Sequence, residues 1–196
     1  IAAFSEVDDA LDTIVTKTGA TGAEMGKFED SFREVAKSMP VELQAVGDAI
    51  GEVNTQFGFT GDKLEKASEQ MIKFAEINGQ DVTASTIASK EAMEAFELKA
   101  EDLDMVLDSV TKTAQNTGVG TDKLFDSVVR GAPQLKSLGL NFAQATEVMG
   151  RFEQKGIDSS KALSYMSRAQ VTFAKEGKTL EEGLAELTEK MKNSKS

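Results

Sequence analysis

Residues 58–79 read Gly-Phe-Thr-Gly-Asp-Lys-Leu-Glu-Lys-Ala-Ser-Glu-Gln-Met-Ile-Lys-Phe-Ala-Glu-Ile-Asn-Gly, and this stretch contains the signals that decide the fold. Glycine stands at both ends, and Leu64, Met71 and Phe74 lie between them at helical spacing. Glycine accepts the left-handed conformation beyond a helix C-terminus, and a Thr or Asp side chain satisfies the free amides that open the next helix. The stretch therefore predicts one helix between two tight turns.

The same punctuation recurs along the chain. Apolar stripes at helical spacing over 7–15, 25–39 and 43–57 end at Gly19, Pro40 and Gly58 respectively. Further glycines close the later segments, and most are followed by an apolar residue and then by a capping or acidic residue. The segments predicted in this way are 59–78, 80–97, 98–118, 119–139, 140–156 and 157–177.

Strand signals are poor, because the β-branched residues are scattered and no run alternates for long between apolar and polar residues. We therefore predict a compact all-α domain of about ten short-to-medium helices joined by tight Gly/Thr/Ser-capped turns. Residues 1–58 are expected to form acidic N-terminal helical hairpins, and residues 59–196 a helix–turn–helix array packed with them as one domain. The segments are no close sequence repeat, so the sequence does not itself predict a solenoid. Frequent breaks exclude one uninterrupted coiled coil, and Pro133 is expected to split or kink its helix.

The composition excludes several classes of function. The chain has 196 residues without Cys, His or Trp, so it has no imidazole base, thiolate nucleophile, disulfide or His/Cys metal site. Catalysis would have to rest on carboxylates, Ser/Thr or Lys. No stretch approaches the roughly 18 apolar residues that a membrane span requires. The chain starts at Ile1 without a signal-peptide pattern, and we expect it to be a piece of something larger.

The net charge of −11 is unevenly distributed. Residues 1–98 contain 8 basic and 19 acidic side chains, whereas residues 99–196 contain 14 of each. The imbalance argues against sequence-independent binding to DNA or RNA, which needs lysine and arginine at the phosphates. It suggests that the two halves face different surroundings and that the acidic half offers a surface to a basic partner. The simpler interpretation is that surface charge drifts between neighbouring helices.

Short motifs that resemble catalytic or nucleotide sites do not fit their required context. The sequence 22–27 has three residues between its glycines where a phosphate-binding loop needs four, and it follows a helical pattern. The sequence 118–120 lacks the third glycine of a dinucleotide fingerprint. Ser109 and Lys112 match Ser-x-x-Lys and 17–19 matches Lys-Thr-Gly of penicillin-recognising enzymes, but their order is reversed and no Ser-Asp-Asn is present.

Paired carboxylates remain a conceivable catalytic set, because glycoside hydrolysis needs only two Asp or Glu groups. With 33 acidic residues no pair can be singled out, and a sugar site usually offers aromatic platforms that a chain with no Trp and one Tyr hardly supplies. No calcium-binding loop is present. We therefore predict no enzyme and no catalytic, cofactor-binding or metal-ligating residue, and we expect the Met and Phe residues to form core.

Several strings, taken in order, resemble a known family. The sequences are 9–13, 17–22, 49–61 followed by Leu64, 74–79 with 81–82, 117–124, 131–133, 138–140 and 156–160. Together they are similar to the core region of the tape measure proteins of long-tailed bacteriophages and their prophages. The resemblance spans about residues 4 to 177.

The resemblance implies a structural virion protein involved in tail assembly, tail-length determination and genome ejection. Proteins of this family lie in the lumen of the tail tube and leave it ahead of the DNA. The implied partners are tail-tube, tail-tip and tail-assembly chaperone proteins, with a possible homo-oligomer. The implied locations are the virion tail and, during assembly, the host cytoplasm. The resemblance implies no cofactor, no specific nucleic-acid binding and no catalytic residue. What this chain shares with the family is the set of helix-ending glycines and capping residues.

A ruler function can be compared with the length of the chain. As one continuous helix the 196 residues would span roughly 290 Å at about 1.5 Å per residue. The glycine punctuation predicts instead that the chain folds back on itself, which favours assembly or ejection over length measurement. The alternatives are a helical adaptor or effector domain, a peptidoglycan hydrolase that uses paired carboxylates, and a helical pore-former.

Overall fold

A computed structural model describes residues 2–193 and contains ten α-helices, a short 3-10 helix at Ala100–Asp102 and no strand within that range. The all-α prediction is confirmed. The helices are α1 (Ala2–Thr18), α2 (Gly22–Ser38), α3 (Leu43–Phe57), α4 (Gly61–Asn78), α5 (Val82–Ala95), α6 (Leu103–Thr117), α7 (Thr121–Ser137), α8 (Phe142–Lys155), α9 (Ser159–Lys175) and α10 (Leu180–Asn193).

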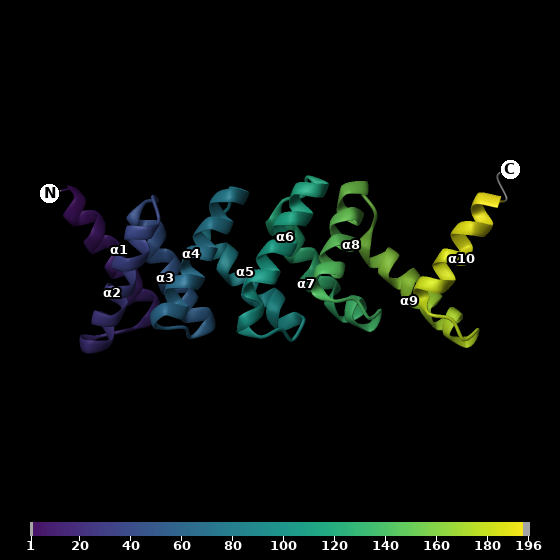
Figure 1. The fold of residues 1–196 in the computed structure, drawn as a ribbon, viewed down its shortest axis with the longest axis horizontal. Helices are drawn as coiled ribbons and strands as arrows, with labels where there is room; N and C mark the ends of the chain where they lie inside the picture. The colour runs from purple at the N-terminus through teal and green to yellow at the C-terminus, as the bar shows by residue number, and fades with distance from the viewer. Residues whose placement is uncertain (1, 194–196) are drawn as a thin grey trace.

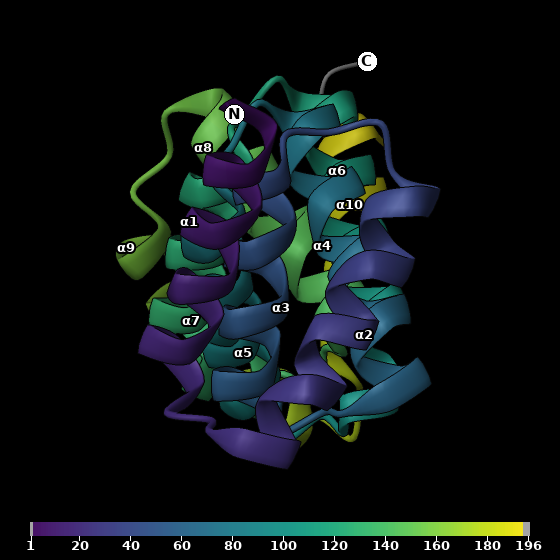
Figure 2. The same ribbon diagram turned by 90° about the vertical axis from the view of Figure 1, so that its left-hand side faces the viewer.

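The helices form a row of hairpins along the longest axis of the molecule, with the two termini at opposite ends (Figure 1). Each of the helices α1 to α7 packs on the helix two further along the chain, so that α1, α3, α5, α7 and α9 form one layer. Helices α2, α4, α6 and α8 form the second layer in the same way. Viewed from the N-terminal end, α1 and α2 stand side by side in front of their successors (Figure 2). This is the arrangement of an α-solenoid.

Polar contacts between hairpins show the regularity of the stacking. Between successive hairpins, hydrogen bonds join residues from 31 apart, as in Ser38 to Glu69, to 39 apart, as in Lys136 to Glu97. Ser31 of α2 donates to Glu65 of α4, and Ser38, further along α2, donates to Glu69, further along α4. The two helices therefore run parallel. The helices on either side of residue 58 also pack on each other, and the expected division of the chain at that residue stays a prediction.

The predicted turn chemistry determines where helices end. Gly58 and Gly79 adopt left-handed φ values of 69° and 62° directly after α3 and α4, as their positions in the sequence predict. Asp81 opens α5 by accepting a hydrogen bond from the Ala84 amide at 2.8 Å. Asn141 and Gln144 form a reciprocal capping box at the start of α8. The short turns hold consecutive helices antiparallel.

Pro133 does not split its helix, and that part of the prediction was wrong. Helix α7 continues through Pro133 to Ser137. The proline removes one backbone donor, but Ala132 and Leu135 on either side of it are buried at 3% and 0% exposure. Burial of this apolar face stabilises the helix across the missing hydrogen bond.

The hydrophobic core runs along the row and becomes thin at the C-terminal end. Buried apolar side chains are contributed by α1 to α8, whereas α9 contributes Leu163 alone to the buried core. In the middle of the row, α5 packs against α3, α4, α6 and α7. Its buried Thr86 and Ser89 hydroxyls donate to carbonyls one turn earlier at 2.7 Å, which satisfies them without a side-chain partner.

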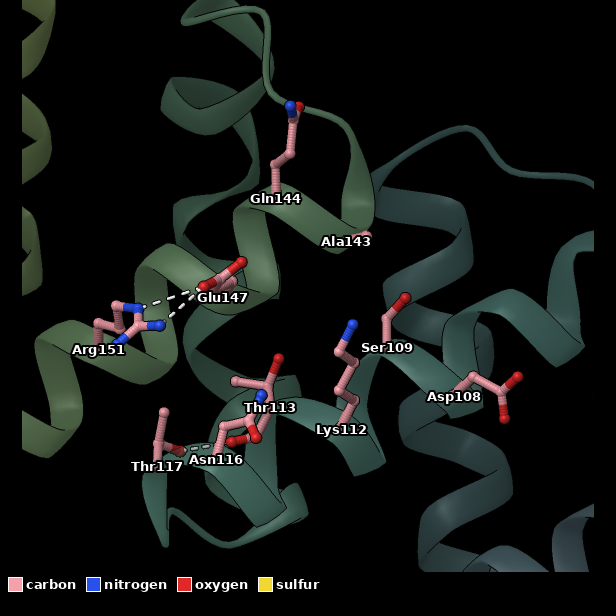
Figure 3. A pocket seen from close by; sticks show the side chains of 10 residues that line it. All are labelled: Asp108, Ser109, Lys112, Thr113, Asn116, Thr117, Ala143, Gln144, Glu147 and Arg151. Carbon is pink, nitrogen blue, oxygen red and sulfur yellow. Dashed lines mark hydrogen bonds and ion pairs between the residues drawn. The ribbon is translucent and has the colours of Figure 1, made fainter.

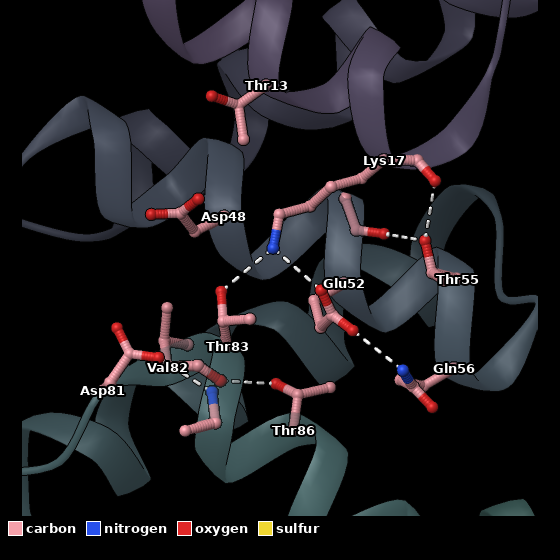
Figure 4. A network of polar contacts seen from close by, with 12 residues as sticks. Thr13, Lys17, Asp48, Glu52, Thr55, Gln56, Asp81, Val82, Thr83 and Thr86 are labelled. Atoms are coloured by element: carbon pink, nitrogen blue, oxygen red, sulfur yellow. Dashed lines mark hydrogen bonds and ion pairs between the residues drawn. The ribbon is translucent and has the colours of Figure 1, made fainter.

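A partly buried ion pair ties three helices of one layer together (Figure 4). The Lys17 ammonium of α1 donates to the Glu52 carboxylate of α3 at 2.7 Å and to the Thr83 hydroxyl of α5 at 3.0 Å. Gln56 donates to the other oxygen of Glu52 at 2.8 Å. Because Glu52 is only 7% exposed, these partners, rather than water, supply most of its hydrogen bonds.

Two small residues bring α1 and α3 into close contact. A Cβ added to Gly47 would lie 2.6 Å from the carbonyl oxygen of Ala10, which is a backbone atom and has no freedom to turn aside. The absence of a side chain at Gly47 therefore determines how closely the first helix packs on the third.

We predict that Gly47→Ala lowers the free energy of unfolding by about 1–3 kcal/mol, because α1 must move away from α3. Gly26→Ala is the matched control, since Gly26 also lies inside a helix but has no atom within 4 Å of the added Cβ. That control should raise stability by about 0.5–1 kcal/mol through helix propensity. Chemical denaturation monitored by circular dichroism measures both changes, and equal effects would contradict the close approach.

We further predict that Lys17→Met destabilises the protein by on the order of 3 kcal/mol, because it leaves the buried Glu52 charge unpaired. The double variant Lys17→Met/Glu52→Leu should recover most of this loss. Lys66→Met is the surface control, because Lys66 and Asp104 are 3.9 Å apart with side chains 73% and 60% exposed. It should cost less than about 0.5 kcal/mol. If Lys17→Met leaves the free energy of unfolding unchanged in the same denaturation assay, the ion pair does not stabilise the fold.

Candidate interaction surfaces

An acidic groove lies where the turn between α2 and α3 meets the end of α4 and the start of α5. It has a volume of about 770 Å³. Its lining includes the four carboxylates Glu42, Asp48, Glu76 and Asp81 and no lysine or arginine. None of the four forms an ion pair with any residue in the described part of the chain. The groove therefore presents concentrated, uncompensated negative charge.

The floor of this acidic groove is apolar. Ile72, Ala75 and Val82 line it and are buried at 2%, 5% and 7% exposure. Figure 4 shows Asp48 and Asp81 projecting beside the Lys17 network. Apolar lining residues together with four carboxylates fit a segment that carries both apolar and basic side chains.

A second groove lies between α6 and α8 and has mixed charge (Figure 3). It contains Asp108 and Glu147 together with Lys112 and Arg151. Arg151 is bound to Glu147 of its own helix at 3.0 Å. Because two acidic and two basic side chains line it, this groove offers no net charge to a partner.

The motif look-alikes have structural roles in the fold. The Ser109 hydroxyl donates to the Met105 carbonyl at 2.7 Å, so it is not activated by Lys112 one turn further along α6. Lys17, in the Lys-Thr-Gly match, is bound to Glu52 and Thr83. The glycine pair of 22–27 lies in the first turns of α2, and that helix follows α1 rather than a strand. The structure supports no nucleophile or nucleotide loop at these positions.

Carboxyl groups with altered pKa also serve the fold. Asp158 accepts the Lys161 amide at 3.0 Å, and this backbone hydrogen bond lowers the pKa of its carboxyl. Hydrogen bonds from Lys178 and Lys190 lower the pKa of Glu186 to about 2. A glycosidase general acid needs the opposite, a raised pKa. Within residues 2–193 no group of acidic side chains is arranged to hold a metal ion, and no helix is long and apolar enough to cross a membrane.

The sequence indicated the acidic half of the chain but not this groove. Glu42 and Asp48 come from the turn before α3 and from α3 itself, whereas Glu76 and Asp81 lie at least 28 residues further along the chain, and only the stacking of the hairpins brings the two pairs together. The sequence analysis named no site residue, and spacing along the chain contains no signal that would have identified these four.

Comparisons with known proteins match this chain to proteins of the phage tail. The family model described as phage-related minor tail protein matches residues 29–196. The chain is also 22% identical over 183 residues to the tape measure protein of Pneumococcus phage Dp-1, an alignment that covers 93% of this chain and 16% of that protein. The chain thus spans about a sixth of the length of that relative. No solved structure matches. The chain belongs to the phage-related minor tail proteins, a family of structural proteins of the phage tail.

Proposed function

We propose that this chain is a folded segment of a tape measure protein that acts in tail assembly and genome ejection and adds little to tail length. The observation that carries the proposal is the similarity to a phage tape measure protein over 93% of a chain that folds into stacked hairpins. The segment would lie in the lumen of the tail tube in the virion and in the host cytoplasm during assembly.

The geometry of stacked hairpins limits any contribution to length. Packed helices lie about 8–10 Å apart, so each hairpin advances the row by about 10 Å. The 37 residues of one repeat, 82–118, would span about 56 Å as a continuous helix at about 1.5 Å per residue. A folded array thus measures several times less distance per residue than an extended ruler.

We predict that an in-frame deletion of residues 82–118 in the phage gene changes mean tail length by no more than about 10 Å, the advance of one hairpin. The deletion removes one whole repeat, so neighbouring hairpins can stack again. The matched control removes the same number of residues from a continuous-helix segment of the same gene and should shorten tails by about 56 Å. Electron microscopy of purified virions gives both lengths. A shortening of about 56 Å by the first deletion, with assembly intact, would show that this segment is itself a ruler.

The acidic groove suggests where tail partners bind. We infer that a basic segment of a tail-tip or tail-assembly chaperone protein enters the groove between the α2–α3 turn and the start of α5. The uncompensated carboxylates and the apolar floor support this assignment. Electrostatic attraction of this kind raises the association rate and weakens with salt.

The groove predicts a salt-dependent interaction. Glu42→Gln/Glu76→Gln should weaken binding to the cognate tail protein about 5-fold at low salt and much less at high salt, because two partner-facing charges are lost. Glu24→Gln/Glu91→Gln changes two exposed carboxylates of the same half outside the groove and serves as the control. Pull-downs and titrations with purified tail proteins at two salt concentrations measure the effect. Equal weakening by both double variants would argue against the groove.

A further inference from the structure

The link between α5 and α6, residues 96–102 in the middle of the row, differs from the other links between helices in the described part of the chain. It has seven residues and contains the short 3-10 helix, whereas the others have three or four residues. We propose that this link is a hinge at which the row bends between two bodies, residues 2–95 and 103–193. The proposal concerns motion within the row and does not rest on the proposed function.

The backbone of the link is strained at Glu97. Its φ is 56°, and within residues 2–193 it is the one residue other than glycine with a left-handed φ. The Leu98 amide donates to the Met93 carbonyl at 2.8 Å, and Leu140 closes the same turn after α7, where Gly139 takes the left-handed position. The Cβ atom makes this conformation costly for glutamate, whereas glycine adopts it readily. The stacked row therefore holds this link in an unfavourable conformation.

The contact between α4 and α6, which we call the seam, is loosely packed. Helix α4 meets α6 less extensively than α6 meets α8, and the two ribbons stand further apart along the row (Figure 1). A Cβ on Gly150 of α8 would clash with the Thr113 methyl group of α6, so those two helices approach closely. At the seam there is instead a hollow of about 210 Å³, whose lining includes Phe59, Ala67 and Leu103.

Polar contacts between exposed side chains cross the seam. The Lys63 ammonium and the Glu101 carboxylate are 3.2 Å apart, and both side chains are exposed. The Gln70 amide donates to the Asp104 carboxylate, also at the surface. Exposed pairs of this kind contribute little to stability, because water competes for both partners. The seam can therefore open at small cost.

The layer of α1, α3, α5, α7 and α9 stays packed across the same point. Helix α5 meets α7 nearly as extensively as α3 meets α5. Two buried aromatic pairs lie beside this contact: Phe74 with Phe125 at 5.9 Å between ring centroids, and Phe96 with Phe142 at 5.3 Å. Burial of apolar surface is not directional, so α7 can rotate on α5 while these rings remain covered. Bending thus pivots on α5 and α7 and opens the seam.

Opening of the seam relieves the strain at Glu97. The φ value of this residue sets the direction in which the chain leaves α5, so it changes when α6 turns away from α4. The acidic groove is lined only by residues of the first body. Bending therefore changes the direction of the second body relative to the groove and leaves the groove itself intact.

Distances between pairs of spin labels test the hinge, because the chain contains no cysteine of its own. Lys73→Cys/Lys112→Cys places labels on α4 and α6, on the two sides of the seam. Lys112→Cys/Glu147→Cys is the matched control, with labels on α6 and α8 inside the second body. All three positions are exposed. We expect a second, longer distance population for the seam pair and a single population for the control pair.

Two substitutions at residue 97 test whether the link is the hinge. Glu97→Gly removes the cost of the left-handed conformation in the stacked row, so the fraction of the longer distance should fall about 5-fold. Glu97→Gln keeps the Cβ atom and removes only the exposed ion pair with Lys136. It should change that fraction less than about 2-fold.

Three outcomes would overturn the proposal. A single distance population for the seam pair, as narrow as that of the control pair, would show that the row does not bend here. A longer population in both label pairs would show bending along the whole row. Equal effects of Glu97→Gly and Glu97→Gln would show that the backbone at residue 97 does not control the motion.

Discussion

The packing of each of the helices α1 to α7 on the helix two further along the chain is the constraint on which the rest of the structure depends. A single hairpin cannot bury its apolar faces alone, so the hairpins stabilise one another by stacking. Tight glycine-ended turns keep consecutive helices antiparallel, and close approach at Gly47 allows α1 to lie against α3. The Lys17–Glu52 pair, extended to Thr83, then joins three successive helices of one layer. Each feature serves the same stacking.

Helix positions were predictable from the sequence because local chemistry determines them. Gly58 and Gly79 end helices at the residues that the sequence indicates, and the all-α class follows from that pattern. The prediction that Pro133 splits its helix was wrong because burial of the neighbouring residues outweighs the loss of one backbone hydrogen bond. Local signals are dependable where the helix end is exposed and less so where tertiary packing competes.

The stacking itself was not predictable, although it is regular. Contacts between successive hairpins are made by different chemistry: an ion pair joins Lys17 to Glu52, whereas the Asn78 amide donates to the Thr111 hydroxyl. The structural period therefore leaves no repeated residues in the sequence. The acidic groove was missed for the same reason, since its carboxylates converge only when two turns stack. Charge counting indicated the half of the chain that contains this groove, but not the residues that line it.

Zero-length cross-linking of lysine to carboxylate, read by mass spectrometry, tests the stacked arrangement most directly. The account predicts covalent links between Lys17 and Glu52, Lys63 and Glu101, and Lys136 and Glu97, whose charged atoms lie 2.7, 3.2 and 3.0 Å apart. These pairs connect residues more than thirty positions apart, which no isolated helix brings together. Links confined to neighbours on one helix, such as Lys90 and Glu94, would contradict the stacked row of hairpins.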